Sequence, residues 1–233
     1  MKKFDAILFD LDGTLLPMDN EEFTKGYLGM LAKAMAPHGY APEMLIPAMW
    51  KGVGAMVKND GSRKNFDAFW AAFSAPIGEK IYQDIPVFDA FYEKEFCAAV
   101  RFTQPSAAAK TAVELAHAAA DKVILATNPL FPMVAVKERM RWVGLVPEDF
   151  DYITHYENSG FCKPNPKYYT EIAENCGIDL ANSLMIGNNA AEDAAAAMAA
   201  GLSAYLVTDC LISDGELPDC PRGSMKDLLK FLQ

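Results

Sequence analysis

Hydrophobic positions follow two different patterns along this chain, and the change falls near residue 100. From residue 16 to 100, apolar side chains recur at helical spacing between recognisable helix starts and stops. Beyond residue 100, short runs that are apolar throughout alternate with longer helical stretches. Strands buried on both faces have this composition in parallel sheets that are covered by helices. The pattern therefore predicts an α/β fold with a doubly wound parallel sheet.

The elements can be placed from these patterns. Predicted strands cover residues 3–9, 123–126, 152–154, 184–186 and 204–207. Predicted helices cover residues 19–35, 44–57, 87–97, 106–120, 132–142, 166–176 and 190–200, and a further helix begins at Asn65 and includes Phe73. Asp19 is expected to cap the first helix and Asn65 the third.

The first strand and the later strands belong to one sheet, so the helical stretch between them is an insertion. We expect a core domain formed by residues 1–16 and 101–233. Residues 17–100 form an inserted all-helical domain, and its aromatic side chains at helical spacing are expected to pack between helices.

Composition excludes several classes of function. The net charge of −10 argues against a nucleic-acid surface, which needs a basic stripe. Five cysteines, an odd number without C-x-x-C spacing, favour neither a disulfide framework nor a zinc site. No apolar stretch reaches the length of a membrane span, and charges interrupt any signal-like start. We expect a cytoplasmic protein without a membrane or nucleic-acid partner, and the oligomeric state stays open.

The most informative polar residues follow the first strand. Side chains alternate along a strand, so Asp10 and Asp12 leave the same face. Two adjacent carboxylates repel each other unless a cation or a shared proton compensates. Such a pair suits a nucleophile or metal ligand beside a general acid, although an Asp-Gly turn at Gly13 explains it equally well.

Polar residues also follow later strands, where ligands collect in parallel sheets. Thr127 and Asn128 follow the second strand and suit phosphate oxygens, and Lys163 supplies a fixed charge after the third. Asn188 and Asp193 follow the fourth, with oxygen atoms of the kind that Mg²⁺ prefers. Each has a simpler interpretation, as a turn, a surface lysine or a helix cap. With the Asp10 and Asp12 pair they make four polar elements in this order, each at the end of a strand, so coincidence is improbable.

These residues resemble the motifs of the haloacid dehalogenase superfamily of hydrolases over nearly the whole chain. The run Asp-Leu-Asp-Gly-Thr from Asp10 matches the first motif D-x-D-G-T, and Thr127 matches the second. Lys163 with its following proline matches the third, and residues 187–193 have the spacing of the fourth. The helical insertion lies where the family carries a C1-type cap. The chain looks most like phosphoglycolate phosphatases and β-phosphoglucomutases.

The resemblance implies a Mg²⁺-dependent phosphatase acting on a small phosphorylated metabolite. Asp10 would attack phosphorus to form an aspartyl-phosphate, and Asp12 would serve as acid and base. Lys163 would neutralise charge. The substrate-binding residues would be Gly13, Thr127, Asn128 and Lys163, and the metal ligands would be Asp10, Asp12, Asn188 and Asp193.

One position departs from the family pattern, because Asn188 stands where the fourth motif has an acidic residue. An amide oxygen still coordinates Mg²⁺, so we expect weaker metal binding rather than none. Glu192 is a replacement ligand if the local register differs by one residue.

Alternative functions stay open at this point. A phosphomutase would share all four motifs, and a phosphonatase would need a cap lysine such as Lys51, Lys58 or Lys64. Dehalogenases of the superfamily generally lack an acidic residue at the position of Asp12. A non-catalytic phosphate- or metal-binding protein would explain Asn188.

Two further leads concern the substrate and the nucleophile. The basic stretch 51–64 could bind a second anionic group of the substrate, although a solvated surface is the simpler interpretation. Cys162 lies beside Lys163, which could lower its pKa, but no partner histidine is identifiable.

Overall fold

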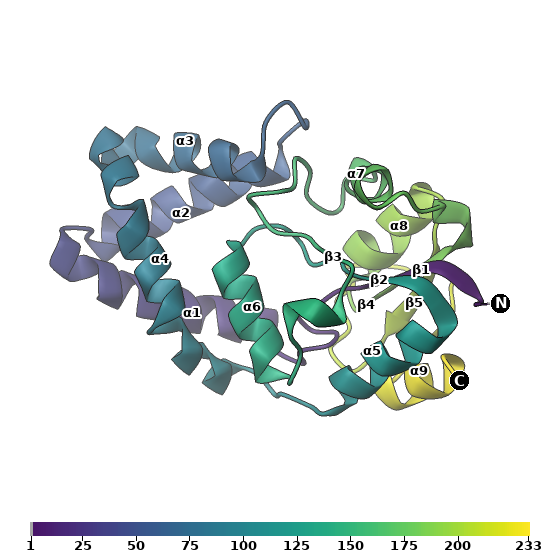
Figure 1. Cartoon of the computed structure of the whole chain (residues 1–233). Coiled ribbons are helices and arrows are strands. Elements are labelled where there is room, and N and C mark those ends of the chain that lie inside the picture. Colours follow the sequence, from purple (N-terminus) through teal and green to yellow (C-terminus); the bar gives the residue numbers. More distant parts are fainter. Residues whose placement is uncertain (1) are drawn as a thin grey trace.

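Six parallel strands form a single sheet in the right-hand part of the computed structural model, which describes residues 2–233 (Figure 1). The strands lie in the order β3-β2-β1-β4-β5-β6. Their bounds are β1 Phe4–Phe9, β2 Ala120–Leu125, β3 Tyr152–Ile153, β4 Ser183–Gly187, β5 Ser203–Val207 and β6 Arg222–Gly223. Strand β1 pairs with β2 on one side and β4 on the other, so the first strand of the sequence is central. The predicted doubly wound parallel sheet is confirmed.

Helices surround this sheet and extend beyond one end of it. Those that follow residue 100 are α5 Ala108–Ala119, α6 Met133–Trp142, α7 Lys167–Cys176, α8 Ala196–Ala199 and α9 Met225–Phe231. Those of the insertion are α1 Asn20–Met35, α2 Pro42–Val57, α3 Asn65–Ile77 and α4 Ile85–Glu93. In Figure 1 the insertion lies to the left of the sheet and α6 lies between the two parts.

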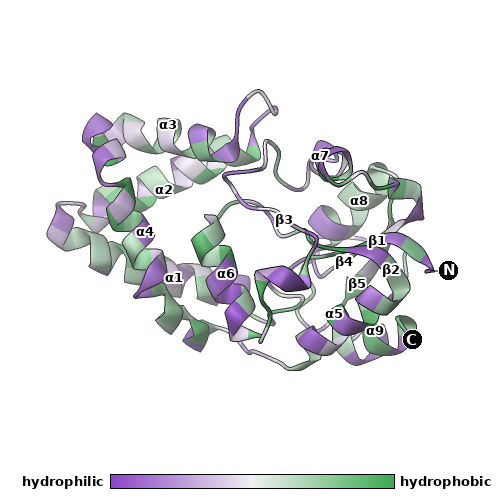
Figure 2. Cartoon of the chain, in the orientation of Figure 1, coloured by the Kyte–Doolittle hydropathy of each residue, from purple (hydrophilic) through white to green (hydrophobic). Residues whose placement is uncertain are grey.

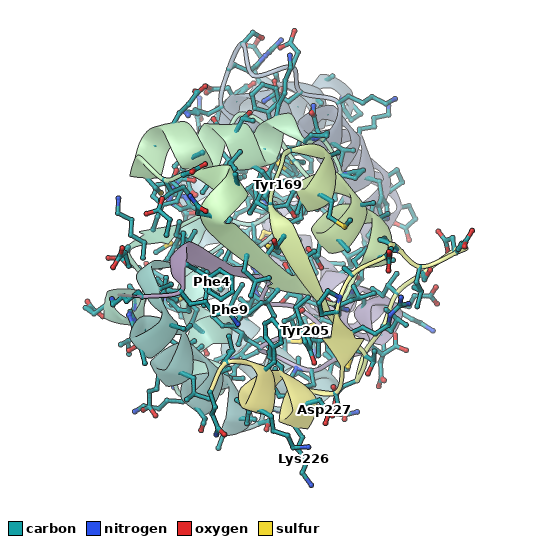
Figure 3. All side chains as sticks on the ribbon, turned by 90° about the vertical axis from the view of Figure 1, so that its right-hand side faces the viewer. Phe4, Phe9, Tyr169, Tyr205, Lys226 and Asp227 are labelled. Atoms are coloured by element: carbon teal, nitrogen blue, oxygen red, sulfur yellow. The ribbon has the colours of Figure 1, made fainter. Side chains whose placement is uncertain are left out.

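The two faces of β1 pack against different helices, as its alternating side chains require. Ile7 and Phe9 belong to the larger core cluster, which includes buried residues of α5, α6 and α9. Ala6 and Leu8 belong to a second cluster with residues of α7 and α8. Figure 3 looks along the sheet from its amino end, with Tyr169 of α7 above β1 and Asp227 of α9 below it.

The inserted helices bury a dense set of aromatic rings. Phe69, Trp70 and Phe73 of α3 pack at ring-centroid distances of 5.2–5.4 Å, and Phe88 of α4 packs against Trp70 at 5.6 Å. Figure 2 shows hydrophobic and hydrophilic positions alternating along α1 to α4, as expected of helices with one buried face. These aromatic rings therefore pack between the inserted helices, as their spacing predicts.

Local differences from the sequence predictions have simple causes. Asp19 does cap α1, accepting hydrogen bonds from the main-chain nitrogens of Glu21 and Glu22. The prediction that Asn65 caps α3 is wrong: Lys64 holds the N-cap position, and the buried Asn65 amide bonds Asn59 instead. The predicted helix 190–200 begins with a π-helical turn, Ala190–Ala195. Strand β6 was not predicted because two residues carry no apolar pattern.

Within residues 2–233, none of the helices combines the length and the apolar character needed to cross a membrane.

Candidate active site

A lysine between two carboxylates forms the centre of the candidate site. Asp10 directly follows β1, and its main-chain nitrogen donates to the carbonyl of Ile186 in β4. Lys163 Nζ donates to Asp10 Oδ1 at 2.9 Å and to Asp193 Oδ1 at 2.6 Å. All three side chains are buried. The structure thus brings together residues from three strand ends, at the carboxyl edge of the sheet.

Burial dominates the protonation of Asp10. It raises the pKa of this carboxyl to about 8, against the lowering effect of Lys163 and with a further increase from the Asp193 and Asp12 charges. Burial alone would lower the pKa of Lys163, but the two facing carboxylates raise it well above its usual value. Lys163 is therefore a permanent cation. It is shared between Asp10 and Asp193, which leaves this group one negative charge in excess when both acids ionise.

Asp193 is held from both sides. Its Oδ1 accepts from Lys163, while its Oδ2 accepts from the main-chain nitrogens of Asn188 and Asn189 at 3.0 and 2.9 Å. Asp193 lies in the π-helical turn, so the free N–H groups after β4 point at its carboxylate. Gly187 permits this approach, because a Cβ there would overlap the Asp193 side chain.

Asn188 makes hydrogen bonds that an aspartate could not make in full. Its Oδ1 accepts from the Thr14 hydroxyl at 2.9 Å, and its Nδ2 donates to the main-chain carbonyl of Cys210 at 2.6 Å. Gly13 has φ +83°, and a Cβ at that position would overlap the Asn188 amide. The amide is therefore fitted to its surroundings, through both the donor and the acceptor.

Asp12 forms an ion pair that the sequence did not indicate. Arg139 of α6 donates through Nη1 to Asp12 Oδ2, and its side chain is completely buried. The guanidinium also lies 4.2 Å from the ring centroid of Phe131. Burial raises the pKa of Asp12, opposed by Arg139 and Lys163. Asp12 Oδ1 and Arg139 Nη2 are buried without a hydrogen-bond partner in the described part of the chain.

The helical pattern of α6 contained a signal for Arg139. Its buried positions include Ala135, Val136 and Met140, and Arg139 lies on the same stripe. A charged residue on an apolar helix face is rarely buried without a partner, so it indicates an opposite charge nearby. The distance of 127 residues between Arg139 and Asp12 hides that partner from the sequence.

A cavity of about 210 Å³ opens over these groups. Asp10, Asp12, Thr127, Asn128, Glu192, Asn188 and Asp193 line it, together with residues of α1. The Asn128 amide donates to Glu192 Oε2 at 3.0 Å, and burial raises the pKa of Glu192. All predicted site residues except Gly13 and Lys163 therefore line one cavity. Those two lie directly behind it, in contact with Asn188 and Asp10.

Two other leads do not reach this cavity. Lys51, Lys58, Arg63 and Lys64 are not among its lining residues, and Lys64 Nζ instead bonds the Asn158 carbonyl at 2.6 Å. The structure also argues against Cys162 as a nucleophile, for which the sequence offered no partner histidine. Burial, followed by the Glu192 charge, raises the pKa of its thiol to about 12, and the thiol accepts from the Asn65 amide. A thiolate nucleophile is thus disfavoured.

The donor atoms of the site suit a hard cation. In the described residues, no three His, Cys, Asp or Glu side chains are grouped to hold a metal ion. The predicted ligands instead combine the Asp10 and Asp193 carboxylates with the Asn188 amide and the Asp12 main chain. All of these donors are oxygen atoms, and Mg²⁺ binds oxygen through few carboxylates. When Asp10 and Asp193 are both ionised, the excess negative charge around Lys163 favours a cation at the same place.

Comparisons with known proteins agree with this arrangement. Residues 4–201 match the family model of the haloacid dehalogenase-like hydrolases. No curated protein sequence gave a significant match.

Solved structures of similar fold include proteins of different described activities. A haloacid dehalogenase-superfamily (HAD) phosphatase from Thermococcus onnurineus shares 17% identity at TM-score 0.61, covering 100% of this chain and 98% of its own. The magnesium-bound putative HAD-hydrolase YfnB from Bacillus subtilis shares 18% at TM-score 0.62, covering 99% of each chain. A 2-haloacid dehalogenase from Pseudomonas syringae pv. tomato shares 18% at TM-score 0.62, covering 99% and 100%. At these identities the likeness concerns the fold.

Proposed function

The chain belongs to the haloacid dehalogenase-like hydrolase family, and from this membership we propose that it is a Mg²⁺-dependent phosphatase of small phosphate monoesters. The neighbours of similar fold include phosphatases and dehalogenases, so the choice between the two reactions depends on the site itself.

The observation that carries the proposal is the position of Asp12 beside the nucleophile. A halide ion leaves carbon without a proton, whereas an alkoxide leaving phosphorus needs one. Asp12 supplies such an acid two residues from Asp10, and Arg139 fixes its carboxyl group at the cavity wall. Departure of a halide in a dehalogenase does not require an acid at the position of Asp12. Ester hydrolysis requires it in both half-reactions.

The chemistry then follows from the contacts of each group. Lys163 occupies Asp10 Oδ1, which leaves Oδ2 to attack phosphorus. As the ester P–O bond breaks, Asp12 gives its proton to the leaving alcohol, and Oδ1 is the oxygen free to carry it because Arg139 holds Oδ2. Water then attacks the aspartyl-phosphate and returns a proton to Asp12, releasing inorganic phosphate and restoring Asp10.

The remaining groups bind the phosphoryl oxygens and the cation. Thr127 lies at the cavity wall, where its hydroxyl suits a phosphoryl oxygen. Asp10, the Asp12 main-chain carbonyl, Asn188 and Asp193 would hold Mg²⁺. When bound, Mg²⁺ would neutralise the phosphate and favour ionised Asp10, whose pKa is otherwise raised.

The proposal is tested with p-nitrophenyl phosphate and with 2-chloropropionate. We expect Mg²⁺-dependent release of phosphate by the wild type, its loss in Asp10→Asn, and no release of chloride. Acid-quenched enzyme should carry covalent phosphate on Asp10. Chloride release without phosphatase activity would identify a dehalogenase. Binding of phosphate without turnover under any divalent metal would identify a binding protein.

A further inference from the structure

A second cavity, enclosed by the inserted helices, adjoins the candidate active site. Its volume is about 120 Å³, and its walls come from α1 to α4 and from the loop before α6. Thr24, Leu130 and Phe131 line this cavity and also the cavity over Asp10. The two cavities are therefore neighbours that meet at these three side chains.

The walls of this second cavity are mainly aromatic and aliphatic. Phe69, Trp70, Phe88, Met49 and Val53 contribute apolar surface, and Trp50 is 53% exposed beside them. A cavity of about 150 Å³ lined by aliphatic and aromatic groups binds benzene, so this one is of the size that a single ring or a short branched chain fills. Trp70 Nε1 is buried without a hydrogen-bond partner in residues 2–233.

The charges around the cavity exclude a second anion. Among its described lining residues, Asp89 is the single charged side chain, and burial followed by the Glu157 and Glu93 charges raises the pKa of its carboxyl. Within residues 2–233 no basic side chain lines the cavity, and Lys51, Lys58, Arg63 and Lys64 of the stretch 51–64 are not among its lining residues. A carboxylate or second phosphate placed in this space would meet apolar walls and a negative charge.

We propose that this cavity binds the alcohol part of the substrate, and that the preferred substrates are phosphate monoesters of a compact apolar or aromatic alcohol. The proposal rests on the phosphatase function, since it places the ester group beside Asp10. It adds the substrate class, which the four motifs do not contain. Burial of a ring in the apolar cavity then contributes binding that a polyol ester cannot obtain.

The first experiment compares two esters of primary alcohols, so that the leaving oxygens are chemically similar. With Mg²⁺ present, kcat/KM for benzyl phosphate should exceed that for glycerol 1-phosphate by about tenfold or more, as expected for an apolar group in a fitted pocket. Equal values, or a preference for glycerol 1-phosphate, would overturn the proposal.

A pair of variants on one helix locates the effect. Val53 of α2 lines the cavity, whereas Val57, one turn later, is exposed and does not. Val53→Trp should lower kcat/KM for benzyl phosphate about tenfold, because the larger side chain fills the cavity. It should change kcat/KM for glycerol 1-phosphate about twofold or less. Val57→Trp should change neither. An equal loss for both esters in Val53→Trp would contradict the proposal.

A binding measurement separates this proposal from the phosphatase function. By calorimetry with Mg²⁺, benzylphosphonate, which the enzyme cannot hydrolyse at its P–C bond, should bind about tenfold more tightly than methylphosphonate. Val53→Trp should remove the difference and Val57→Trp should retain it. If this holds while no ester is hydrolysed, the cavity binds its ligand and the phosphatase function fails. If esters are hydrolysed and both phosphonates bind alike, the function holds and the cavity proposal fails.

Discussion

Arg139 reaches from the buried face of α6 to Asp12, and its Nη1 donates to one carboxylate oxygen of that residue. This ion pair fixes the orientation of the Asp12 carboxyl group, whose second oxygen has no hydrogen-bond partner in the described residues. Because the guanidinium is fully buried, no solvent cation or water can replace it readily. The proton transfer assigned to Asp12 therefore depends on a residue that does not touch the substrate.

The first prediction concerns the positioning role of Arg139. In Arg139→Met, kcat/KM for alkyl phosphates, which reports formation of the aspartyl-phosphate, should fall about 10²-fold, since a general acid contributes 10²–10⁴-fold. The kcat/KM for p-nitrophenyl phosphate should fall much less, because its weakly basic leaving group hardly needs a proton. In Arg139→Lys, kcat/KM for alkyl phosphates should lie between the wild-type value and that of Arg139→Met. Equal losses for both leaving groups would indicate a structural role only.

Arg141→Met is the matched control for this variant. Arg141 lies on the same helix but is exposed and pairs with Glu138 at 2.6 Å. The Arg141→Met variant should show the same dependence of kcat/KM on the leaving group as the wild type. Thermal unfolding of each variant checks that it folds, since removing Arg139 leaves the partly buried Asp12 carboxylate without its ion pair.

The second prediction concerns Asn188. In Asn188→Asp, a carboxylate oxygen replaces the amide that donates to the Cys210 carbonyl, so two acceptors face each other. Without metal, we expect a loss of about 1–3 kcal/mol, which lowers Tm by about 2–4 °C for each kcal/mol in a chain of this size. With Mg²⁺ the added charge should strengthen binding about tenfold, or about 1.4 kcal/mol. Calorimetric Mg²⁺ titration of the variant and the wild type measures this.

Asn189→Asp adds the same charge one residue away. Asn189 Oδ1 accepts from the main-chain nitrogens of Ala191 and Glu192, and an aspartate oxygen would keep both bonds. Without metal, the free energy of unfolding of Asn189→Asp should therefore stay close to that of the wild type. If Asn188→Asp binds Mg²⁺ no better than the wild type, Asn188 is not a ligand.

The third prediction concerns Gly13. Gly13→Ala combines a left-handed φ with overlap on the Asn188 amide, so we expect a loss of about 2–4 kcal/mol and reduced activity. Gly29→Ala is the control, because Gly29 lies exposed in α1 and an added Cβ there meets no atom within 4 Å. It should stabilise the protein by about 0.5–1 kcal/mol, from helix propensity alone. Urea unfolding measures the free energy of unfolding of both variants. Equal values for Gly13→Ala and Gly29→Ala would contradict the prediction.

The fourth prediction concerns pH and Asp10. Its pKa of about 8 in the folded protein exceeds the value near 4 of an unfolded chain, so the folded state holds the proton more tightly. In EDTA, its contribution to stability is complete below about pH 4 and is lost as pH rises through about 8. Asp10→Asn should therefore reduce the fall in Tm over this interval.

Asp19→Asn is the control for charge removal, since Asp19 is an exposed helix cap that asparagine can replace. It should leave the slope of Tm against pH unchanged. Mg²⁺ should raise the Tm of the wild type at pH 8 and should raise that of Asp10→Asn less. An identical pH slope in the wild type and Asp10→Asn would show that Asp10 titrates normally.

Periodicity was sufficient for the fold but not for every contact of the site. Apolar runs such as 123–126 and 184–186 identify buried parallel strands, and the edge rule for such sheets then predicts that Asp10 and Lys163 approach each other. Arg139 was missed because a sequence does not pair charges across 127 residues. Asn65 was assigned to a cap because its side chain is a good capping group, whereas its tertiary contacts with Asn59 decide its place.

The central position of β1 has a consequence for synthesis of the protein. Asp10 is made early, but its strand gains its second neighbour only when β4, Ser183–Gly187, has emerged. At about 5–20 residues per second the nascent chain waits about 10–40 s for that partner. During this interval β1 has an open edge available for wrong pairing, and Asp10 lacks the charge of Lys163. Ribosome-bound chains stalled before β4 should therefore depend on chaperones more than chains stalled after it.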